Sequence, residues 1–321
     1  MKIAYITGCL GFIGSYFTRK VLKEGWYVYG IDKCTYASNL HLIEEFGQYN
    51  NFKFQNTDIN DLPYINDCDY VINFAAESHV DNSIKNSQAF FNSNTIGVKN
   101  LLENIKNKNS NCSNTPLFVQ ISTDEVYGDI DTGSHIETDI LKPSNPYSAS
   151  KASADMIVTA WSRTFGINYL IFRPTNNYGF GQYPEKLIPL SLKNLYRGKK
   201  IKLHNNGTPV RTWLHVQDTA DAIYTGIVSG KNNEIYNISG NIQLQNIEVV
   251  QELIKHFTTE FQDTSIFERH IDYNYVRSGQ DVRYSLDDTK LRDLGWSPKQ
   301  DFYSNIRDIV KRTTQSLFFN E

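Results

Sequence analysis

The sequence predicts an α/β protein with a doubly wound parallel sheet and a smaller α/β lobe in its C-terminal half. Short apolar segments alternate with longer stretches of helical periodicity, which is the pattern of repeated strand–helix–strand units. A glycine-rich turn follows the first apolar segment, and hydroxyl and acidic residues follow a later one, as expected where parallel strands end at one edge of a sheet. The predicted strands span residues 3–7, 27–31, 52–55, 70–74, 117–121 and 168–172.

Length and composition allow one large unit or two closely joined ones. The chain has 321 residues, of which 40% are hydrophobic, enough for a substantial core. We predict a first domain at residues 1–175 and a second lobe mainly at residues 176–321, parts of which return to the first domain. No linker rich in Gly, Ser or Pro separates them, so the lobe should dock onto the first domain. Its predicted elements are strands at residues 200–204 and 234–238 and helices at residues 216–228, 246–259 and 303–316.

Charge and residue spacing exclude several classes of partner. A net charge of -3 without a basic stripe argues against nucleic acid. No apolar run approaches the roughly 20 residues that span a bilayer, which predicts a soluble cytoplasmic protein without a membrane partner. The four cysteines show no CxxC spacing and the seven histidines form no HxxxH pair, so we expect reduced thiols and no metal.

Three glycines, Gly8, Gly11 and Gly14, follow the first predicted strand and open a helical stretch. Glycines at this spacing allow a tight turn, close approach of the backbone to a pyrophosphate, and close packing of the helix on the strand. The free N–H groups of the helix N-terminus favour negative charge. The turn, with Phe12 and Ile13, therefore predicts a Rossmann-type dinucleotide site.

Asp32 ends the second predicted strand, at the distance expected for a carboxylate that binds the adenosine ribose. An acid at this position repels a 2′-phosphate, so the sequence favours NAD over NADP. Ala75 and Ala76, after the fourth strand, are small enough to admit close approach of the cofactor. We expect the remaining cofactor contacts at Lys33, Thr35, Asp58, Ile59, Ser93 and Asn176.

Tyr147 and Lys151 are four residues apart at the start of a helical stretch, so both side chains lie on one face. A tyrosine is a poor base near neutral pH, because its reference pKa is about 10. An adjacent ammonium favours the phenolate and lowers the pKa of the tyrosine. The pair is therefore a candidate for contacting the cofactor and for removing a proton from a sugar hydroxyl while hydride leaves for the nicotinamide.

A hydroxyl and two acids, Thr123, Asp124 and Glu125, follow the fifth predicted strand. With the whole segment STDEVYG at residues 122–128, the glycine turn and the Tyr–Lys pair, the chain resembles the nucleotide-diphosphate-glucose 4,6-dehydratases of the extended short-chain dehydrogenase/reductase family. The resemblance covers nearly the whole chain. Related epimerases carry small hydroxyl or neutral residues where the two acids stand, so this pair is the most function-specific feature of the sequence.

The resemblance implies a lyase with NAD as a bound catalyst. Oxidation at carbon 4 of the glucose acidifies the hydrogen on carbon 5, which a base removes while an acid protonates the oxygen leaving carbon 6. By this resemblance Glu125 is the base, Asp124 is the protonated acid, and Thr123 binds the oxygen on carbon 4. Hydride then returns to carbon 6, leaving a 4-keto-6-deoxy sugar of the kind used in rhamnose biosynthesis. Two neighbouring carboxylates tend to separate their pKa values, which suits this division of roles.

The second lobe should bind the nucleotide sugar. Arg211 matches the position of a diphosphate-binding arginine, and the planar guanidinium fork suits phosphate oxygens. The segment after Pro184 resembles one that closes over the nucleotide. The residues implied in substrate binding are Ser78, His79, Thr123, Asn177, Lys186, Leu187, Arg211, Asn246, Arg277, Gln280 and Arg283. For Arg283, an ordinary salt bridge is an equal alternative to a phosphate contact.

Departures from the bacterial dTDP-glucose enzymes bear on the nucleotide. Thr212 stands where an acid is usual, and Ser278 and Gln280 stand where a proline and a histidine are usual. Residues 81–83 and 286–291 look more like the plant and fungal UDP-glucose 4,6-dehydratases. The sequence therefore favours UDP-glucose, with dTDP-glucose as the alternative.

Two other functions remain open on the sequence alone. A nucleotide-sugar 4-epimerase would share the cofactor, Tyr147 and Lys151 but return hydride to carbon 4. A non-catalytic NAD-sensing module that binds partners would have little reason to retain the Thr-Asp-Glu and Tyr–Lys sets together, and it would be favoured if the two sets lay far apart. We also expect a homodimer formed through helices at residues 90–106 and 147–165, as is common in the family.

Overall fold

The computed structural model of the protein describes residues 1–109, 115–261, 267–275 and 281–319. Its largest feature is a seven-stranded sheet in the order β10-β6-β5-β4-β1-β2-β3. All pairings in this sheet are parallel. The strands are β1 (Ile3–Thr7), β2 (Tyr27–Asp32), β3 (Phe52–Asn56), β4 (Tyr70–Asn73), β5 (Leu117–Ile121), β6 (Tyr169–Pro174) and β10 (Glu234–Ile238).

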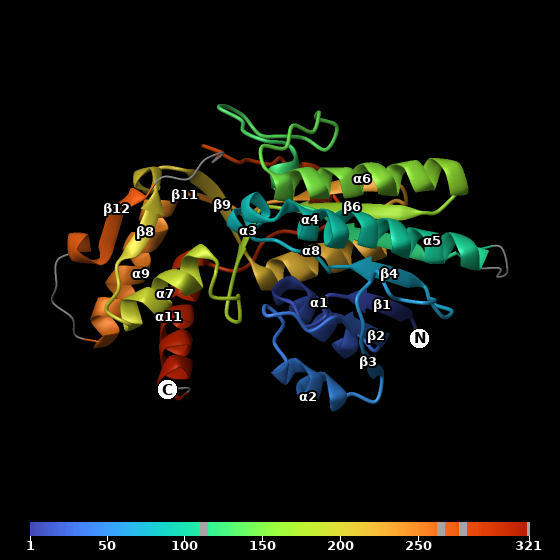
Figure 1. Ribbon diagram of the computed structural model, residues 1–321, viewed down its shortest axis with the longest axis horizontal. Helices are drawn as coiled ribbons and strands as arrows, with labels where there is room; N and C mark the ends of the chain where they lie inside the picture. The colour runs from blue at the N-terminus through green and yellow to red at the C-terminus, as the bar shows by residue number, and fades with distance from the viewer. Residues whose placement is uncertain (110–114, 262–266, 276–280, 320–321) are drawn as a thin grey trace.

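Helices cover both faces of this sheet, which confirms the predicted doubly wound fold (Figure 1). The helices α1 (Phe12–Lys23) and α8 (Val216–Ser229) lie on one face, and α5 (Gly97–Asn109) and α6 (Pro146–Phe165) lie on the other. The chain runs outward from β1 through β2 to β3 and then returns to β4 on the other side of β1. The winding therefore reverses between β1 and β4, where open sheets of this kind bind their ligands.

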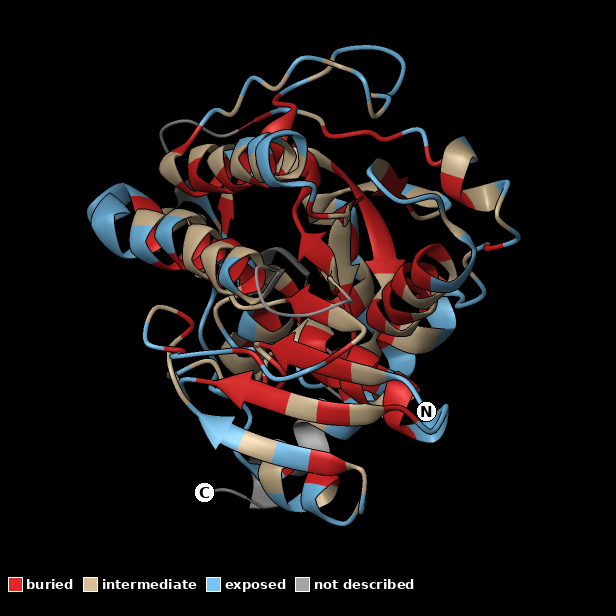
Figure 2. Cartoon of the chain, turned by 90° about the vertical axis from the view of Figure 1, so that its right-hand side faces the viewer, coloured by how far each residue is buried: buried red, intermediate tan, exposed pale blue. Residues whose placement is uncertain are grey.

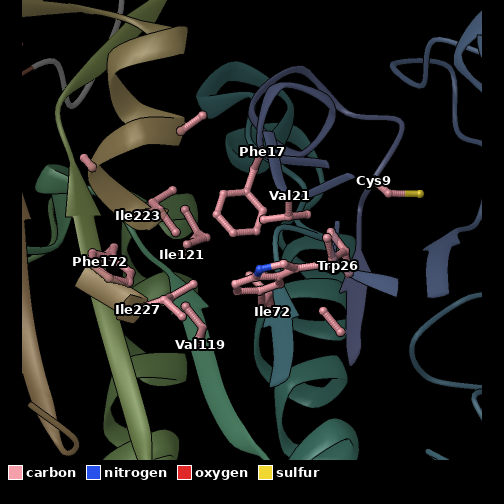
Figure 3. Packing of buried hydrophobic residues seen from close by; sticks show 14 of the residues in the cluster. Cys9, Phe17, Val21, Trp26, Ile72, Val119, Ile121, Phe172, Ile223 and Ile227 are labelled. Carbon is pink, nitrogen blue, oxygen red and sulfur yellow. The ribbon is translucent and has the colours of Figure 1, made fainter. Parts of the chain in front are cut away.

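Separate apolar layers hold the helices on the two faces. On the α1 and α8 face, Phe17, Trp26 and Phe172 belong to one buried cluster (Figure 3). On the α5 and α6 face, Leu101 packs with Phe118 in another. Burying one side chain of this size contributes roughly 1.5–3 kcal/mol, so these layers fix the strand ends relative to one another.

Burial falls from the centre of the sheet toward β3. The central strands β1 and β5 are buried along almost their whole length, because helices cover both of their faces. In the outermost strand β3, Phe52 is buried, whereas most of the other residues are exposed. Figure 2 shows this gradient as red strands in the interior and a mostly pale strand at the margin.

The smaller lobe lies beside the large sheet, on the left in Figure 1. It contains a three-stranded sheet of β11 (Ile242–Gln245), β9 (Val210–His215) and β7 (Asn176–Tyr178), and a two-stranded sheet of β12 (Ile271–Tyr275) and β8 (Ile201–His204). Around them lie α7 (Leu187–Tyr196), α9 (Asn246–Phe261) and α11 (Phe302–Phe319). This lobe has a core of its own that includes Leu192, Leu253 and Ile306. The described residues also form several short helices: α2 (His41–Gly47), α3 (Val80–Lys85), α4 (Ser87–Phe90), α10 (Thr289–Arg292), the 3-10 helices η2 (Asp124–Val126), η3 (Asn205–Gly207) and η4 (Phe267–His270), and the π-helix η1 (Phe91–Ile96).

Two segments differ from the sequence-based expectations. The sequence at residues 106–114 is polar enough to predict a loop, but α5 continues through the first part of this segment to Asn109; residues 110–114 lie outside the described part of the chain. The helix predicted at residues 90–106 is interrupted by η1. There the buried side chain of Asn94 bonds both the N–H (2.8 Å) and the carbonyl (2.9 Å) of Glu77 and also donates to the hydroxyl of Ser150 (2.9 Å). The wider π turn thus accompanies a polar contact with the loop after β4.

Within the ranges described above, no helix is both long and apolar enough to cross a bilayer. The same residues hold no group of three or more His, Cys, Asp or Glu side chains placed to bind a metal ion. Cys9, Cys34 and Cys68 are free thiols, and Cys112 lies outside the described residues.

Candidate active site

A cavity of about 310 Å³ opens where β1, β2, β3, β4, β5 and β6 end. Its walls come from the loops after these strands, from η1, from the start of α6 and from the segment before α7. It brings together all the residues that the sequence indicated for catalysis and for the cofactor. They are Gly8, Gly11, Phe12, Ile13, Gly14, Asp32, Lys33, Thr35, Asp58, Ile59, Ala75, Ala76, Ser93, Thr123, Asp124, Glu125, Tyr147, Lys151 and Asn176.

Two positions of the glycine turn leave no room for a side chain, one because of the loop after β4 and the other because of the turn itself. Gly8 has a φ of 67°, in the left-handed region, and a Cβ there would lie 2.6 Å from the backbone nitrogen of Ala75. A Cβ on Gly14 would press against the carbonyl oxygen of Gly8. The turn therefore presents bare backbone to the cavity at the N-terminus of α1, and this surface fits the pyrophosphate of NAD.

Asp32 ties the glycine turn to the loop after β2. Its Oδ2 accepts a hydrogen bond from the N–H of Leu10 (3.1 Å), and its Oδ1 accepts from the N–H of Cys34 (2.9 Å) and the hydroxyl of Ser38 (2.8 Å). A carboxylate has about four acceptor sites, so capacity remains for ribose hydroxyls. Ser38 also lines the cavity, and the sequence pattern had not indicated it.

Lys33 joins the loops that follow β2, β3 and β4 and also contacts η1. Its Nζ donates to the hydroxyl of Ser93 (3.1 Å) and lies 3.4 Å from Oδ2 of Asp58 and 3.8 Å from Oε1 of Glu77. These contacts hold the side chains around the cavity in one arrangement.

Tyr147 and Lys151 are buried in the first turns of α6. The Nζ of Lys151 donates a 2.5 Å hydrogen bond to the carbonyl oxygen of Ile121, at the end of β5. Burial lowers the pKa of Lys151 to about 8, against the opposing charge of Asp155. This amino group therefore stays mostly charged at pH 7 and loses its proton as the pH rises through about 8.

The expected lowering of the pKa of Tyr147 by Lys151 is wrong for this structure. Burial raises the pKa of Tyr147, and the charges of Glu125 and Asp124 add to the rise, whereas a hydrogen bond with Thr123 opposes it. The lysine amino group is turned toward the carbonyl of Ile121, and burial is the largest cause of the rise.

Asp124 is placed to carry a proton. Its Oδ2 lies 3.1 Å from the hydroxyl of Thr175, and that hydroxyl lies 2.9 Å from the carbonyl oxygen of Thr212, which can only accept. Because the hydroxyl has a single hydrogen, a protonated Asp124 can donate to Thr175 while Thr175 donates to Thr212. Burial, together with the charge of Glu125, raises the pKa of Asp124 to about 7. Asp124 is thus suited to donating a proton near neutral pH.

Glu125 has more exposure and a different set of partners. Its Oε2 accepts a hydrogen bond from Nδ2 of Asn145 at 3.3 Å. Burial raises the pKa of Glu125, but Arg211, this hydrogen bond and Lys186 each oppose the rise. The surroundings of Glu125 therefore favour its ionised form more than those of Asp124 do.

Four of the residues implied in substrate binding, Ser78, Thr123, Asn177 and Lys186, line the cavity. Lys186 crosses its mouth, since its Nζ donates to the backbone carbonyl of Ser78 at 2.6 Å. The Nδ2 of Asn177 donates to the carbonyl of Thr175 at 2.9 Å, so this side chain is held against the loop after β6.

The structure does not place the other implied substrate residues on the cavity wall. The guanidinium of Arg211 donates instead to backbone carbonyls of residues 210, 281 and 282, and that of Arg283 donates to carbonyls of residues 130 and 133. The others among the described residues are His79 at the start of α3, Leu187 at the start of α7, and Asn246 at the start of α9. Arg277 and Gln280 lie outside the described residues.

Comparison with known proteins agrees with this site. The family model described as GDP-mannose 4,6 dehydratase matches residues 5–309. A dTDP-glucose 4,6-dehydratase of Escherichia coli is 39% identical, over 97% of this chain and 92% of its own length. One of Streptomyces niveus is 37% identical, over 95% and 91%.

Solved structures extend the similarity to three dimensions. DesIV of Streptomyces venezuelae, a dTDP-glucose 4,6-dehydratase solved with NAD bound, superposes with a TM-score of 0.90 at 34% identity, covering 99% of this chain and 98% of its own. The UDP-glucose 4-epimerase of Thermotoga maritima gives a TM-score of 0.85 at 25% identity, covering 99% and 100%. The chain therefore belongs to the GDP-mannose 4,6-dehydratase family of extended short-chain dehydrogenases/reductases, as a nucleotide-sugar hydro-lyase with NAD as its cofactor.

Proposed function

We propose that the protein converts dTDP-glucose to dTDP-4-keto-6-deoxyglucose and water. The observation that carries this proposal is the Asp124–Glu125 pair at the end of β5, in which burial gives Asp124 a pKa of about 7 beside a second carboxyl group. The three dehydratases from Escherichia coli, Streptomyces niveus and Streptomyces venezuelae are named for dTDP-glucose. They do not support the preference for UDP-glucose drawn from residues 81–83 and 286–291.

The residues around the cavity divide the proposed reaction among them. NAD, when bound, would supply the hydride chemistry, taking hydride from carbon 4 and returning it to carbon 6. Tyr147 takes the proton of the carbon 4 hydroxyl, whose oxygen Thr123 holds; because burial raises the pKa of Tyr147, this step requires the positive charge of bound NAD to favour the phenolate. Glu125 removes the proton from carbon 5, Asp124 protonates the oxygen that leaves carbon 6 as water, and Glu125 returns a proton to carbon 5 when hydride reaches carbon 6. The other residues in the cavity wall hold the cofactor and the sugar in place.

The alternatives make different predictions. The sensing module would keep the Thr-Asp-Glu and Tyr–Lys sets apart, whereas both line one cavity, and Thr123 interacts with Tyr147. An epimerase would need no acid beside carbon 6, and Asp124 has no role in that reaction.

Mass spectrometry of the product tests the proposal. The purified protein is given dTDP-glucose and UDP-glucose together, and each product is scored for loss of one water. We expect the dehydrated product from dTDP-glucose. Preferential dehydration of UDP-glucose would overturn the choice of nucleotide, and a product of unchanged mass would overturn the dehydratase in favour of the epimerase.

We also propose a homodimer formed through the outer faces of α5 and α6. Met156 in α6 is 58% exposed, and Ile96, just before α5, is 46% exposed. Large apolar side chains that remain this exposed on neighbouring helices suit burial against a second copy.

A further inference from the structure

Asn145 connects the helix that carries Tyr147 to the side chain of Glu125. It is the N-cap residue of α6, and its Oδ1 accepts a hydrogen bond from the backbone N–H of Ser148 at 2.9 Å. Its Nδ2 donates to Oε2 of Glu125 at 3.3 Å. Both ends of one amide group are therefore in use, one by the helix and one by the acid.

The helix cap fixes which end of the amide faces Glu125. A backbone N–H can only donate, so the atom of Asn145 that faces Ser148 must be the oxygen. The NH₂ group must then point the other way, toward Glu125. The cap is reciprocal, because the hydroxyl of Ser148 accepts from the N–H of Asn145 at 3.2 Å. Asn145 is 8% exposed, which leaves its side chain little freedom to turn away.

We propose that Asn145 is a positioning residue that aims Glu125 at carbon 5 and keeps it ionised for proton removal. A donor-only group favours the carboxylate over the protonated acid, and the folding of α6 presets its direction. Because it assigns a role within elimination, this inference rests on the proposed function. It also explains how two adjacent acids stay distinct: Asp124 faces a hydroxyl that can accept its proton, whereas Glu125 faces an amide that can only donate.

Other charged and titratable groups also face Glu125. Arg211 of β9 and Lys186 at the start of α7 favour its ionised form, and Asp281 disfavours it. The charge of Glu125 in turn raises the pKa values of Asp124, Tyr147 and Tyr284. None of these groups changes in the variants below, so a difference between variants reports on Asn145.

Two substitutions separate the helix cap from the contact with Glu125. Asn145→Ser keeps a good N-cap residue, but its shorter side chain ends at the capping hydroxyl and carries no group at the place of the amide nitrogen that donates to Glu125. Ser148→Ala does the reverse: it removes the reciprocal half of the cap and leaves the amide of Asn145 in place. A third variant, Asn145→Asp, keeps the cap and puts a carboxylate where the donor was.

Two readouts follow Glu125 rather than overall folding. The first is its protonation, measured by infrared difference spectroscopy against Glu125→Gln as the blank. The second is the pH dependence of elimination in a single turnover, with oxidation at carbon 4 followed separately as NADH appearance. For Asn145→Ser we expect the pKa of Glu125 and the acidic limb of the elimination profile to rise by about one pH unit, with oxidation unchanged. Asn145→Asp should shift both further, and Ser148→Ala should shift neither.

The inference fails if Asn145→Ser leaves the pKa of Glu125 and the acidic limb at their original values. It fails equally if Ser148→Ala produces the same shift, because the effect would then come from the helix cap. Failure of the proposed function looks different: the unaltered protein would yield no dehydrated product, while the infrared readout would still report whether Asn145 acts on Glu125.

Discussion

Asp124 and Glu125 are neighbours in the chain, yet their carboxyl groups contact different side chains because each points at a different part of the fold. Asp124 faces Thr175 after β6, and Glu125 faces Asn145 at the start of α6. The backbone alone could not distinguish them, since both belong to the single 3-10 turn η2. The division of roles is thus decided by residues that are distant in sequence.

Replacement of Glu125 by Gln should stop the reaction after oxidation. The amide keeps the size and polarity of the side chain, so NAD should remain bound and hydride should still leave carbon 4. Removal of the carbon 5 hydrogen should slow by about 10²–10⁴-fold, the usual contribution of a general base. Stopped-flow absorbance should show NADH that persists. Dehydration at the normal rate would contradict the role given to Glu125.

The elimination step should lose rate as the pH rises through about 7, the pKa of Asp124. An acid must hold its proton to donate it, so the raised pKa preserves the active form below that pH and loses it above. Single-turnover dehydration measured between about pH 6 and 9 should show this alkaline limb. The control is Asp124→Asn, which has no titrating acid and should show slow elimination with no such limb.

Sequence patterns indicated the proposed catalytic residues but not the residues that contact them. The proposed catalytic residues stand at a strand end or at a helix start, where separation along the sequence determines separation in the structure. They are Thr123, Asp124, Glu125, Tyr147 and Lys151. The partners Asn145 and Thr175 act through contacts with residues 20 and 51 positions away. Such pairings depend on the tertiary fold, so the sequence does not reveal them directly. Thr175 does lie just after a predicted strand, and this position could have indicated it as a residue of the site.

At the scale of elements, a latch of side chains joins the loop after β2 to the segment before α7. The hydroxyl of Tyr36 donates to Oε2 of Glu185 at 3.2 Å, and its ring packs edge-on against that of Tyr183, with centroids 5.2 Å apart. Lys186 adds its contact with the carbonyl of Ser78. The latch spans the mouth of the cavity, where it can retain a cofactor that is never consumed.

Loosening this latch should speed the loss of NAD. For Tyr36→Phe combined with Glu185→Gln, we expect the dissociation rate of NAD to rise about fivefold, since one exposed hydrogen bond is worth on the order of 1 kcal/mol. Exchange of bound NAD against a labelled excess measures this rate. Tyr64→Phe, at a tyrosine that is 66% exposed and outside this cavity, is the matched control. Equal rates in both variants would show that the latch does not hold the cofactor.

At the scale of the whole molecule, the large sheet was more predictable than the lobe. Strands β1, β5 and β10 lie at the predicted residues, and β1 and β5 are mostly apolar because helices cover both of their faces. The strands β7, β9 and β11 carry mixed polar and apolar residues, and their pairing brings together residues from 176 to 245. With three, six and four residues, these strands are too short for a local period to predict them, so the sequence left this sheet undescribed.

The proposed dimer makes a prediction about one exposed residue. Met156→Asp should convert a dimer to a monomer, because it places a charge in an apolar contact. Light scattering measures the mass, and circular dichroism checks that the fold is kept. Ile140→Asp is the control, at a residue that is 77% exposed but lies between η2 and α6. A monomer before any substitution, or a dimer after Met156→Asp, would count against this interface.

Strand β10 comes from the second half of the chain but lies beside β6 in the large sheet, and this affects where the protein can be divided. A chain that ends at residue 175 would contain every strand of the large sheet except β10, and β6 would become an edge strand with unpaired N–H and C=O groups along a buried, apolar sequence. Such an edge invites pairing with other chains. We expect this fragment to aggregate, seen as loss from the supernatant after centrifugation, whereas the full chain stays dispersed. The boundary at residue 175 separates two regions of structure without separating two units that fold independently.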